Sequence, residues 1–306
     1  PKQAGGKLFS DPLARLAFWL FLVLSTPVAL HHQFLDPGIP PAWKFVHAIL
    51  TYAVFFPSMM TAFNVIASLE LGARARGGRG LFGWMRALPW GDPSFATQNL
   101  AMILFAFGGI GGLVNASYNV NLVVHNTLFV PAHFHLTVAT AVTLTFMGVL
   151  YWLLPHLTGR KLWAPKLALA QAWTWFVGML IMSGAMHLVG LDYGVPRRAM
   201  LGSASYAEAA WKPLLADAAV GGVILWISVT LFFIVVVGTL VAGARSEQRV
   251  EMPVTEPYQA APVPAWLDNW RLWISFAVVL IVLAYGPVLI NLIATAQLNA
   301  QGLRVW

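Results

Sequence analysis

Long apolar runs, separated by short polar segments, are the dominant pattern of this sequence. Six of the runs reach the length of about 20 residues that a helix needs to cross a bilayer. The first run holds only 15 uncharged residues before His31, so a helix there either continues through the segment after His31 or stops inside the membrane. The runs lie at 16–30, 45–69, 95–124, 131–154, 167–191, 218–244 and 272–296.

This pattern predicts an all-α integral membrane bundle, with seven transmembrane helices in a single domain that covers residues 1–306. The first predicted span is 16–32, and the other six follow the runs. The composition agrees, because only 9% of the residues are charged and 59% are hydrophobic, whereas a soluble domain is about 25% charged. The sequence opens at Pro1 without an initiator Met, so we expect it to be part of a longer chain.

The distribution of Lys and Arg predicts the orientation of the helices, because cytoplasmic loops of membrane proteins are enriched in these residues. Thirteen of the 18 basic residues lie in segments 1–15, 70–94, 155–166 and 245–271. The other five lie in segments 31–44, 192–212 and 297–306. We therefore expect a bacterial or archaeal plasma-membrane protein with a cytoplasmic N-terminus, a periplasmic C-terminus and a polar inner linker at 245–267. The net charge of +7 arises from these short loops and does not indicate a nucleic-acid partner.

The sequence contains no cysteine, which excludes disulfides, iron–sulfur clusters and thiolate–zinc sites. Metal ligands must therefore come from the eight histidines, the ten methionines or oxygen groups. Seven of the histidines fall in one outer layer of the predicted topology, which favours a metal or cofactor layer because imidazole is the usual nitrogen ligand of copper and haem iron. These residues are His31, His32, His47, His125, His133, His135 and His187.

His133 and His135 begin an apolar run at 131–154 that has no formally charged side chain. On an α-helix, residues i and i+2 project about 200° apart, so one backbone offers an imidazole to each of two neighbours. Ionisable groups inside a membrane helix are costly and indicate function. The alternative is that both histidines only form hydrogen bonds to adjacent helices.

Two further pairs suit a cofactor. His31 and His32 are adjacent at the end of the first run and precede Asp36, so both imidazoles can turn toward one copper ion. The alternative is a pair of interfacial histidines bonded to lipid headgroups. Arg197 and Arg198 lie in the outer loop after the fifth span, where paired guanidiniums suit either haem propionates or lipid headgroups.

The second span carries a stripe of hydroxyl groups on one helical face, and these belong to Thr51, Ser58, Thr61 and Ser68. Such a stripe could hold a water chain for protons from the inner side, although hydroxyls that bond back to their own helix are commoner. The GGIGG run at 108–112 is explained by close helix packing alone.

Four motifs together resemble subunit I of the haem–copper oxygen reductases, and the likeness is greatest to the B-type branch with one a-type and one b-type haem. The resemblance runs in order over residues 1–306, and these seven helices resemble the C-terminal part of a subunit that has a dozen or more. The motifs are HHQFLDPG at 31–38, PSMMTAF at 57–63, VVHNTLFVPAHFH at 123–135 and PRRA at 196–199.

The resemblance implies ligand roles for four histidines. His31 and His32 would be two ligands of the copper called copper-B, His133 the proximal ligand of the high-spin a-type haem, and His135 one axial ligand of the low-spin b-type haem. It further implies that His125, Arg197 and Arg198 hold haem propionates, and that Asn121 belongs to the cofactor-binding residues. A proton path from the inner side would be lined by Ser10, Thr51, Ser58 and Thr61.

The sequence also departs from the family pattern. The third copper histidine and the second ligand of the low-spin haem belong to earlier helices and have no counterpart here. The B-type pattern has an aspartate where Asn121 stands, and a Trp and a Gly where Phe129 and Ala132 stand.

The resemblance implies a terminal respiratory oxidase, a cytochrome c oxidase that reduces oxygen to water and translocates protons. Its partners would be the N-terminal helices of subunit I, a subunit II that carries copper-A, cytochrome c as electron donor, and membrane lipid. The alternative is a nitric oxide reductase of the same superfamily. Its metal site usually adds glutamates, and the first five spans contain none.

Overall fold

A computed structural model describes residues 1–36, 39–199, 208–246, 256–259 and 261–294. The described chain is helical, with three isolated β-bridges. The α-helices are α1 (Asp11–Ser25), α2 (Pro41–Ala75), α3 (Pro93–Ala116), α4 (Tyr118–Val124), α5 (Phe129–Phe134), α6 (Thr143–Thr158), α7 (Pro165–Asp192), α8 (Lys212–Ala242) and α9 (Trp270–Ala294). A π-helix, η3 (His135–Val142), joins α5 to α6, and the 3-10 helices are η1 (Ala29–His32), η2 (Gly83–Ala87), η4 (Ala209–Trp211) and η5 (Ala265–Asp268).

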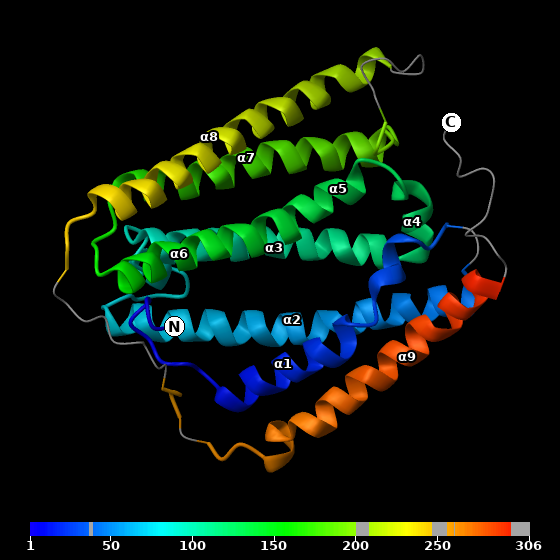
Figure 1. The fold of residues 1–306 in the computed structure, drawn as a ribbon, viewed down its shortest axis with the longest axis horizontal. Helices are drawn as coiled ribbons and strands as arrows, with labels where there is room; N and C mark the ends of the chain where they lie inside the picture. The colour runs from blue at the N-terminus through cyan, green and yellow to red at the C-terminus, as the bar shows by residue number, and fades with distance from the viewer. Residues whose placement is uncertain (37–38, 200–207, 247–255, 260, 295–306) are drawn as a thin grey trace.

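The long helices lie side by side (Figure 1). Helices α7 and α8 form one edge, α3 with the α5–η3–α6 segment forms the middle, and α2, α1 and α9 form the other edge. Large apolar side chains such as Phe56, Phe146 and Trp226 are exposed on the outer faces. Exposed apolar surface of this extent is typical of helices that face lipid or further helices.

Six segments within the described residues are long and apolar enough to cross a membrane, which confirms the predicted multi-pass helical class. The seventh span, predicted at 16–32, is not confirmed. Helix α1 has 15 residues, which gives a length of about 22 Å, against a hydrocarbon core of about 30 Å. It stops at Ser25 because Pro27 follows closely, and a proline cannot continue the backbone hydrogen bonds of a helix.

Two other predicted spans are not uniform α-helices, and the remaining spans differ from the prediction only in their end residues. The span at 95–124 divides at Ser117, whose backbone is extended, so α3 ends at Ala116 and α4 is a separate short helix. The span at 131–154 begins two residues earlier and changes from α to π geometry at His135. Parts of the predicted linker at 245–267 and the last two residues of the predicted span at 272–296 lie outside the described residues.

Polar residues join α6, α7 and α8 inside their apolar core. The Tyr151 hydroxyl donates to Gln171 Oε1 at 2.9 Å, and Gln171 Nε2 donates to Ser228 Oγ at 3.0 Å. The Ser228 hydroxyl in turn donates to the Gln171 carbonyl at 2.8 Å. Because buried polar groups need partners at membrane depth, this closed network fixes the relative register of the three helices.

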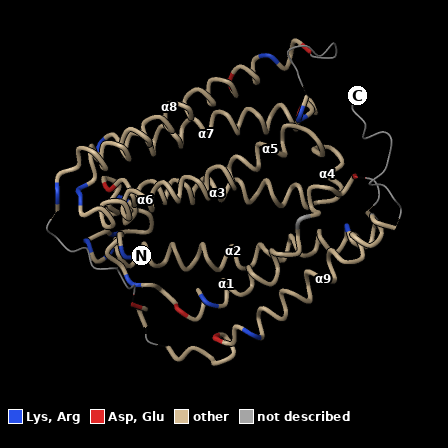
Figure 2. Tube along the Cα trace, viewed as in Figure 1, with Lys and Arg blue, Asp and Glu red and all other residues tan. Residues whose placement is uncertain are grey.

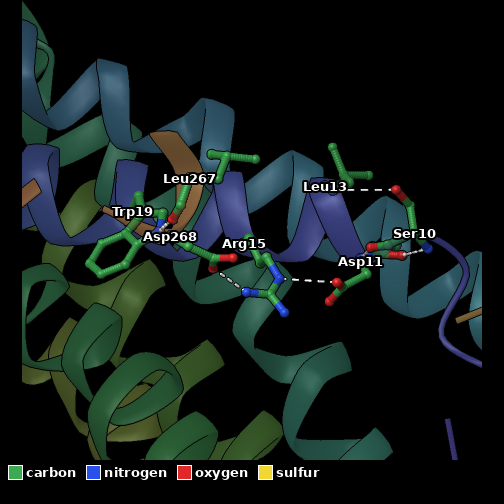
Figure 3. A network of polar contacts seen from close by, with 8 residues as sticks. Ser10, Asp11, Leu13, Arg15, Trp19, Leu267 and Asp268 are labelled. Atoms are coloured by element: carbon green, nitrogen blue, oxygen red, sulfur yellow. Dashed lines mark hydrogen bonds and ion pairs between the residues drawn. The ribbon is translucent and has the colours of Figure 1, made fainter. Parts of the chain in front are cut away.

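A second polar network fixes the start of α1 (Figure 3). Ser10 caps the helix by accepting from the Leu13 N–H at 3.3 Å. Arg15 pairs with Asp11 of its own helix and with Asp268 of η5, and the Trp19 indole N–H donates to the Leu267 carbonyl. Charged residues of this kind lie near the ends of the helices (Figure 2), as expected for helices whose central parts face lipid.

Helices α5 and α7 are in close contact at Gly190, where a Cβ atom would overlap the backbone nitrogen of Phe129. We expect Gly190→Ala to destabilise the protein by about 1–3 kcal/mol, because overpacking forces the backbone to move. Gly184→Ala in the same helix is the matched control, since a Cβ there meets nothing within 4 Å. Thermal unfolding in detergent measures both variants, and equal melting temperatures would contradict the proximity of the two helices.

Candidate functional site

The imidazoles of His31 and His32 face each other in η1, where the chain has left the α1 helix. Their Nε2 atoms are 2.6 Å apart, and their ring centroids are 3.9 Å apart. At that distance one nitrogen must donate a proton to the other. A cation that replaced this proton would meet two nitrogen donors, so the pair fits a copper ion.

Thr51 of α2 determines which nitrogen of His31 carries the proton. The Thr51 hydroxyl donates its single hydrogen to the His47 carbonyl at 2.6 Å, and its oxygen lies 3.3 Å from His31 Nδ1. The hydroxyl can therefore only accept from His31, so Nδ1 carries the hydrogen and Nε2 keeps its lone pair. His32 differs, because its buried Nδ1 has no hydrogen-bond partner in the described part of the chain.

His133 and His135 have different surroundings. His133 is 7% exposed, and its Nδ1–H donates to the Gly108 carbonyl of α3 at 2.7 Å. The Nδ1–H of His135 donates to the Pro131 carbonyl of its own helix at 2.6 Å. A carbonyl oxygen can only accept, so both residues leave Nε2 free as a ligand. The change to π geometry begins at His135, a feature that is frequent at functional sites.

A cavity of about 540 Å³ brings the two parts of the site together, and its volume lies in the range of cofactor pockets. His31 and His133 both line it, whereas His135 does not. The hydroxyl-bearing residues Thr51, Ser58 and Thr61 line the same cavity. The cavity therefore unites His31 of the predicted copper pair, the predicted proximal histidine and three of the four predicted proton-path residues. His32 does not line it, but its ring centroid lies 5.6 Å from that of His133.

Ser10, the fourth predicted proton-path residue, does not line this cavity. Its backbone N–H donates to Asn64 Oδ1 at 2.9 Å, and Asn64 Nδ2 donates back to the Ser10 carbonyl at 2.8 Å. The hydroxyls of Ser58 and Ser68 bond back to their own helix, to the carbonyls of Val54 and Asn64. Hydroxyls of the stripe thus bond back to their own helix, as in the commoner alternative, and residues of the stripe also line the cavity.

The predicted propionate-binding residues lie in the segments before α5 and after α7, away from Ser10. His125 Nε2 lies 3.2 Å from Asp36 Oδ1, so the HHQFLDPG motif contacts the segment before α5. Arg197 donates through Nε and Nη2 to Asn126 Oδ1 at 3.2 and 3.0 Å, while Arg198 is exposed. Burial and the neighbouring Arg198 lower the pKa of Arg197, whereas Asp36 raises it.

Asn121 stands where the family pattern has an aspartate, and its contacts require an amide. The side chain is buried, and its Nδ2 donates to the Asn115 carbonyl at 2.7 Å. Its Oδ1 has no hydrogen-bond partner among the described residues. A carboxylate could not replace this donor.

Sequence reasoning missed two features around the site. His47 is fully buried and its Nε2 contacts the Ala284 carbonyl at 3.2 Å, so it links α2 to α9. The GGIGG run contacts the imidazole of His133, and this proximity could not be inferred from the run itself. In the described chain, no group of three His, Asp or Glu side chains could hold a metal ion, so the pair supplies two donors only.

The sequence matches a family model described as cytochrome C and quinol oxidase polypeptide I over residues 1–224. Cytochrome c oxidase subunit 1 of Thermus thermophilus is 49% identical over 317 residues, covering 100% of this chain and 55% of that relative. An alternative cytochrome c oxidase subunit 1 of Bradyrhizobium diazoefficiens is 26% identical, covering 84% of this chain and 41% of that relative.

A solved structure of a heme-copper terminal oxidase dimer is 41% identical, with a TM-score of 0.86, and the match covers 92% of this chain and 51% of that chain. This chain therefore spans about half the length of the Thermus relative and of the solved chain.

The contacts of Asn121 give a direct test of the local geometry. We expect Asn121→Asp to destabilise the protein by about 1–3 kcal/mol, because a carboxylate oxygen would face the Asn115 carbonyl without a hydrogen between them. The loss should shrink at acidic pH, since a protonated Asp can donate and its folded-state pKa would be raised.

Asn126→Asp is the matched control, because Asn126 Oδ1 only accepts from Arg197 and a carboxylate preserves that role. Thermal unfolding of both variants across pH measures the difference. An Asn121→Asp variant as stable as the parent at neutral pH would show that the amide donor is not required.

Proposed function

The chain belongs to the cytochrome C and quinol oxidase polypeptide I family, and from this membership we propose that it forms part of the catalytic subunit of a terminal respiratory oxidase, a proton-translocating cytochrome c oxidase that reduces oxygen to water. The observation that supports this most directly is the single cavity lined by both His31 and His133. Because the chain spans about half of its Thermus relative, the activity belongs to the assembled subunit.

We propose that His31 and His32 hold copper-B, that His133 holds a high-spin a-type haem, and that His135 holds a low-spin b-type haem. The support for His31, His133 and His135 is that Nδ1 is paired with an oxygen atom of the protein, so the lone pair for a metal lies on Nε2. When bound, the haem irons and copper supply the electron transfer and the oxygen chemistry. The protein supplies the ligands and holds them by packing and hydrogen bonds.

The outer residues His125, Arg197 and Arg198 are proposed to bind haem propionates, and the buried Asn121 is proposed to support this group through its bond to the Asn115 carbonyl. Arg197 supports this role because it is held in place by Asn126 and because a guanidinium can bind a carboxylate in a bidentate way. His125, bonded to Asp36, would position that residue after η1.

Thr51, Ser58 and Thr61 are proposed to line a proton path that enters near Ser10. Three hydroxyl-bearing residues that line one cavity can order a chain of water molecules, even while Thr51 and Ser58 donate to carbonyls of their own helix. The pairing of Ser10 with Asn64 would fix the inner end of this path against α2.

The missing ligands imply partners. The third copper ligand and the second ligand of the low-spin haem would come from N-terminal helices of subunit I, and the exposed apolar faces support further helices or lipid there. Electrons would enter from cytochrome c through a subunit II that carries copper-A. The basic bias supports a plasma-membrane protein with its N-terminus and the 245–267 linker on the cytoplasmic side, and α1 with η1 would form the seventh crossing.

A nitric oxide reductase is not favoured. The relatives bear oxidase names. The residues that line the cavity also include no glutamate in the described chain.

The copper pair gives the first test of the proposed function. Replacing His31 or His32 by Ala in the assembled oxidase should remove copper while both haems remain, because the loss of one imidazole leaves fewer than the three or four donors that copper needs. Metal analysis together with haem spectra measures this. His47→Gln is the control, since His47 is buried nearby but has a structural contact to Ala284. Full copper content in both pair variants would contradict the assignment.

The two haems should respond separately to mutation, because His133 and His135 have different surroundings. We expect His135→Ala to lose the low-spin haem band while the high-spin haem survives, and His133→Ala to disturb the high-spin haem. Reduced-minus-oxidised absorption spectra distinguish the two bands. Loss of the same spectral species in both variants would overturn the assignment of one histidine to each haem.

A further inference from the structure

The imidazole of His133 lies directly against the glycine run of α3. Its Nδ1–H donates to the Gly108 carbonyl at 2.7 Å, which holds one edge of the ring. Its Nε2 has no hydrogen-bond partner within the described residues, although the side chain is more than nine-tenths buried and lines the 540 Å³ cavity. The ring orientation therefore decides where this free nitrogen points.

The glycines after Gly108 differ sharply in what a side chain would meet. A Cβ atom at Gly112 would lie 3.1 Å from His133 Cε1, and its next two neighbours are the two ring nitrogens of the same residue, each at 3.9 Å. A Cβ at Gly111 would lie 3.4 Å from His133 Cβ and Nδ1 and 3.3 Å from His187 Nε2. A Cβ at Gly109 would meet nothing within 4 Å.

Helix packing alone does not explain this gradation. Gly108 serves packing, because a Cβ there would press on Thr137 and Leu136 of the facing helix. The three described atoms nearest to a Cβ at Gly112 all belong to the His133 ring. The missing side chain of Gly112 therefore leaves space for that ring.

We propose that Gly111 and Gly112 are positioning residues that fix the plane of the His133 imidazole. The Gly108 carbonyl holds the Nδ1 edge, and the bare backbone of Gly112 supports the adjacent Cε1 atom. A methyl group at Gly112 would rotate the ring or lengthen the 2.7 Å hydrogen bond, and either change redirects Nε2. This inference rests on the proposed role of His133 as ligand of the high-spin haem.

The test compares Gly112→Ala and Gly111→Ala with Gly184→Ala of α7 in the assembled, haem-loaded oxidase. Gly184 is the control, because a Cβ there meets nothing within 4 Å and the residue does not line the cavity of His133. Resonance Raman spectra of the reduced enzyme report the iron–histidine stretching band of the high-spin haem, and the low-spin haem spectrum is the internal reference. We expect the largest band shift for Gly112→Ala, a smaller one for Gly111→Ala and none for Gly184→Ala. If Gly112→Ala does not assemble, the comparison of Gly111→Ala with Gly184→Ala decides.

Two contrary results are distinguishable. A Gly112→Ala enzyme with lowered thermal stability but an unshifted band would show that the glycine serves helix packing only, and would overturn the inference. A parent enzyme without a histidine-ligated high-spin haem would instead overturn the proposed function, and the inference with it.

Discussion

An imidazole at membrane depth needs a partner for its N–H group, and the whole site depends on how the protein meets this requirement. His31, His133 and His135 each place Nδ1–H next to an oxygen atom that accepts its hydrogen bond. These oxygen atoms belong to Thr51, Gly108 and Pro131 respectively. One interaction thereby fixes the tautomer and the ring, and leaves Nε2 for a metal. His32 is the exception, since its proton is shared with His31 and its Nδ1 has no partner among the described residues.

The scaffold brings these acceptors to the histidines from three helices. Helix α2 supplies Thr51 to the segment after α1, α3 supplies the Gly108 carbonyl, and α5 supplies Pro131 within its own turn. Helix α7 supports the same segment from the other side, because the Ser183 hydroxyl donates to the Ala132 carbonyl at 2.8 Å. The ligand-bearing segment is thus held between α3 and α7 just before it changes to π geometry.

Hydropathy predicted the helical class and the six long spans, because lipid requires apolar side chains over a fixed length. It could not predict the early end of α1, the break at Ser117 or the π-helix at His135, since none of these changes the apolar character of the sequence. Spacing alone indicated that His133 and His135 face different neighbours. The pairing of His125 with Asp36 and the contact of Gly112 with His133 depend on tertiary packing between distant segments, which no local pattern carries.

A cryo-EM map of the assembled oxidase, sharp enough to resolve imidazole rings and metal positions, is the most direct test of the central claim. We expect copper density at the Nε2 atoms of His31 and His32, haem iron at Nε2 of His133 in the same cavity, and a second haem at Nε2 of His135. Metal bound through Nδ1 of these residues, or the absence of metal beside the His31–His32 pair, would contradict the claim that the protein reserves Nε2 for the cofactors.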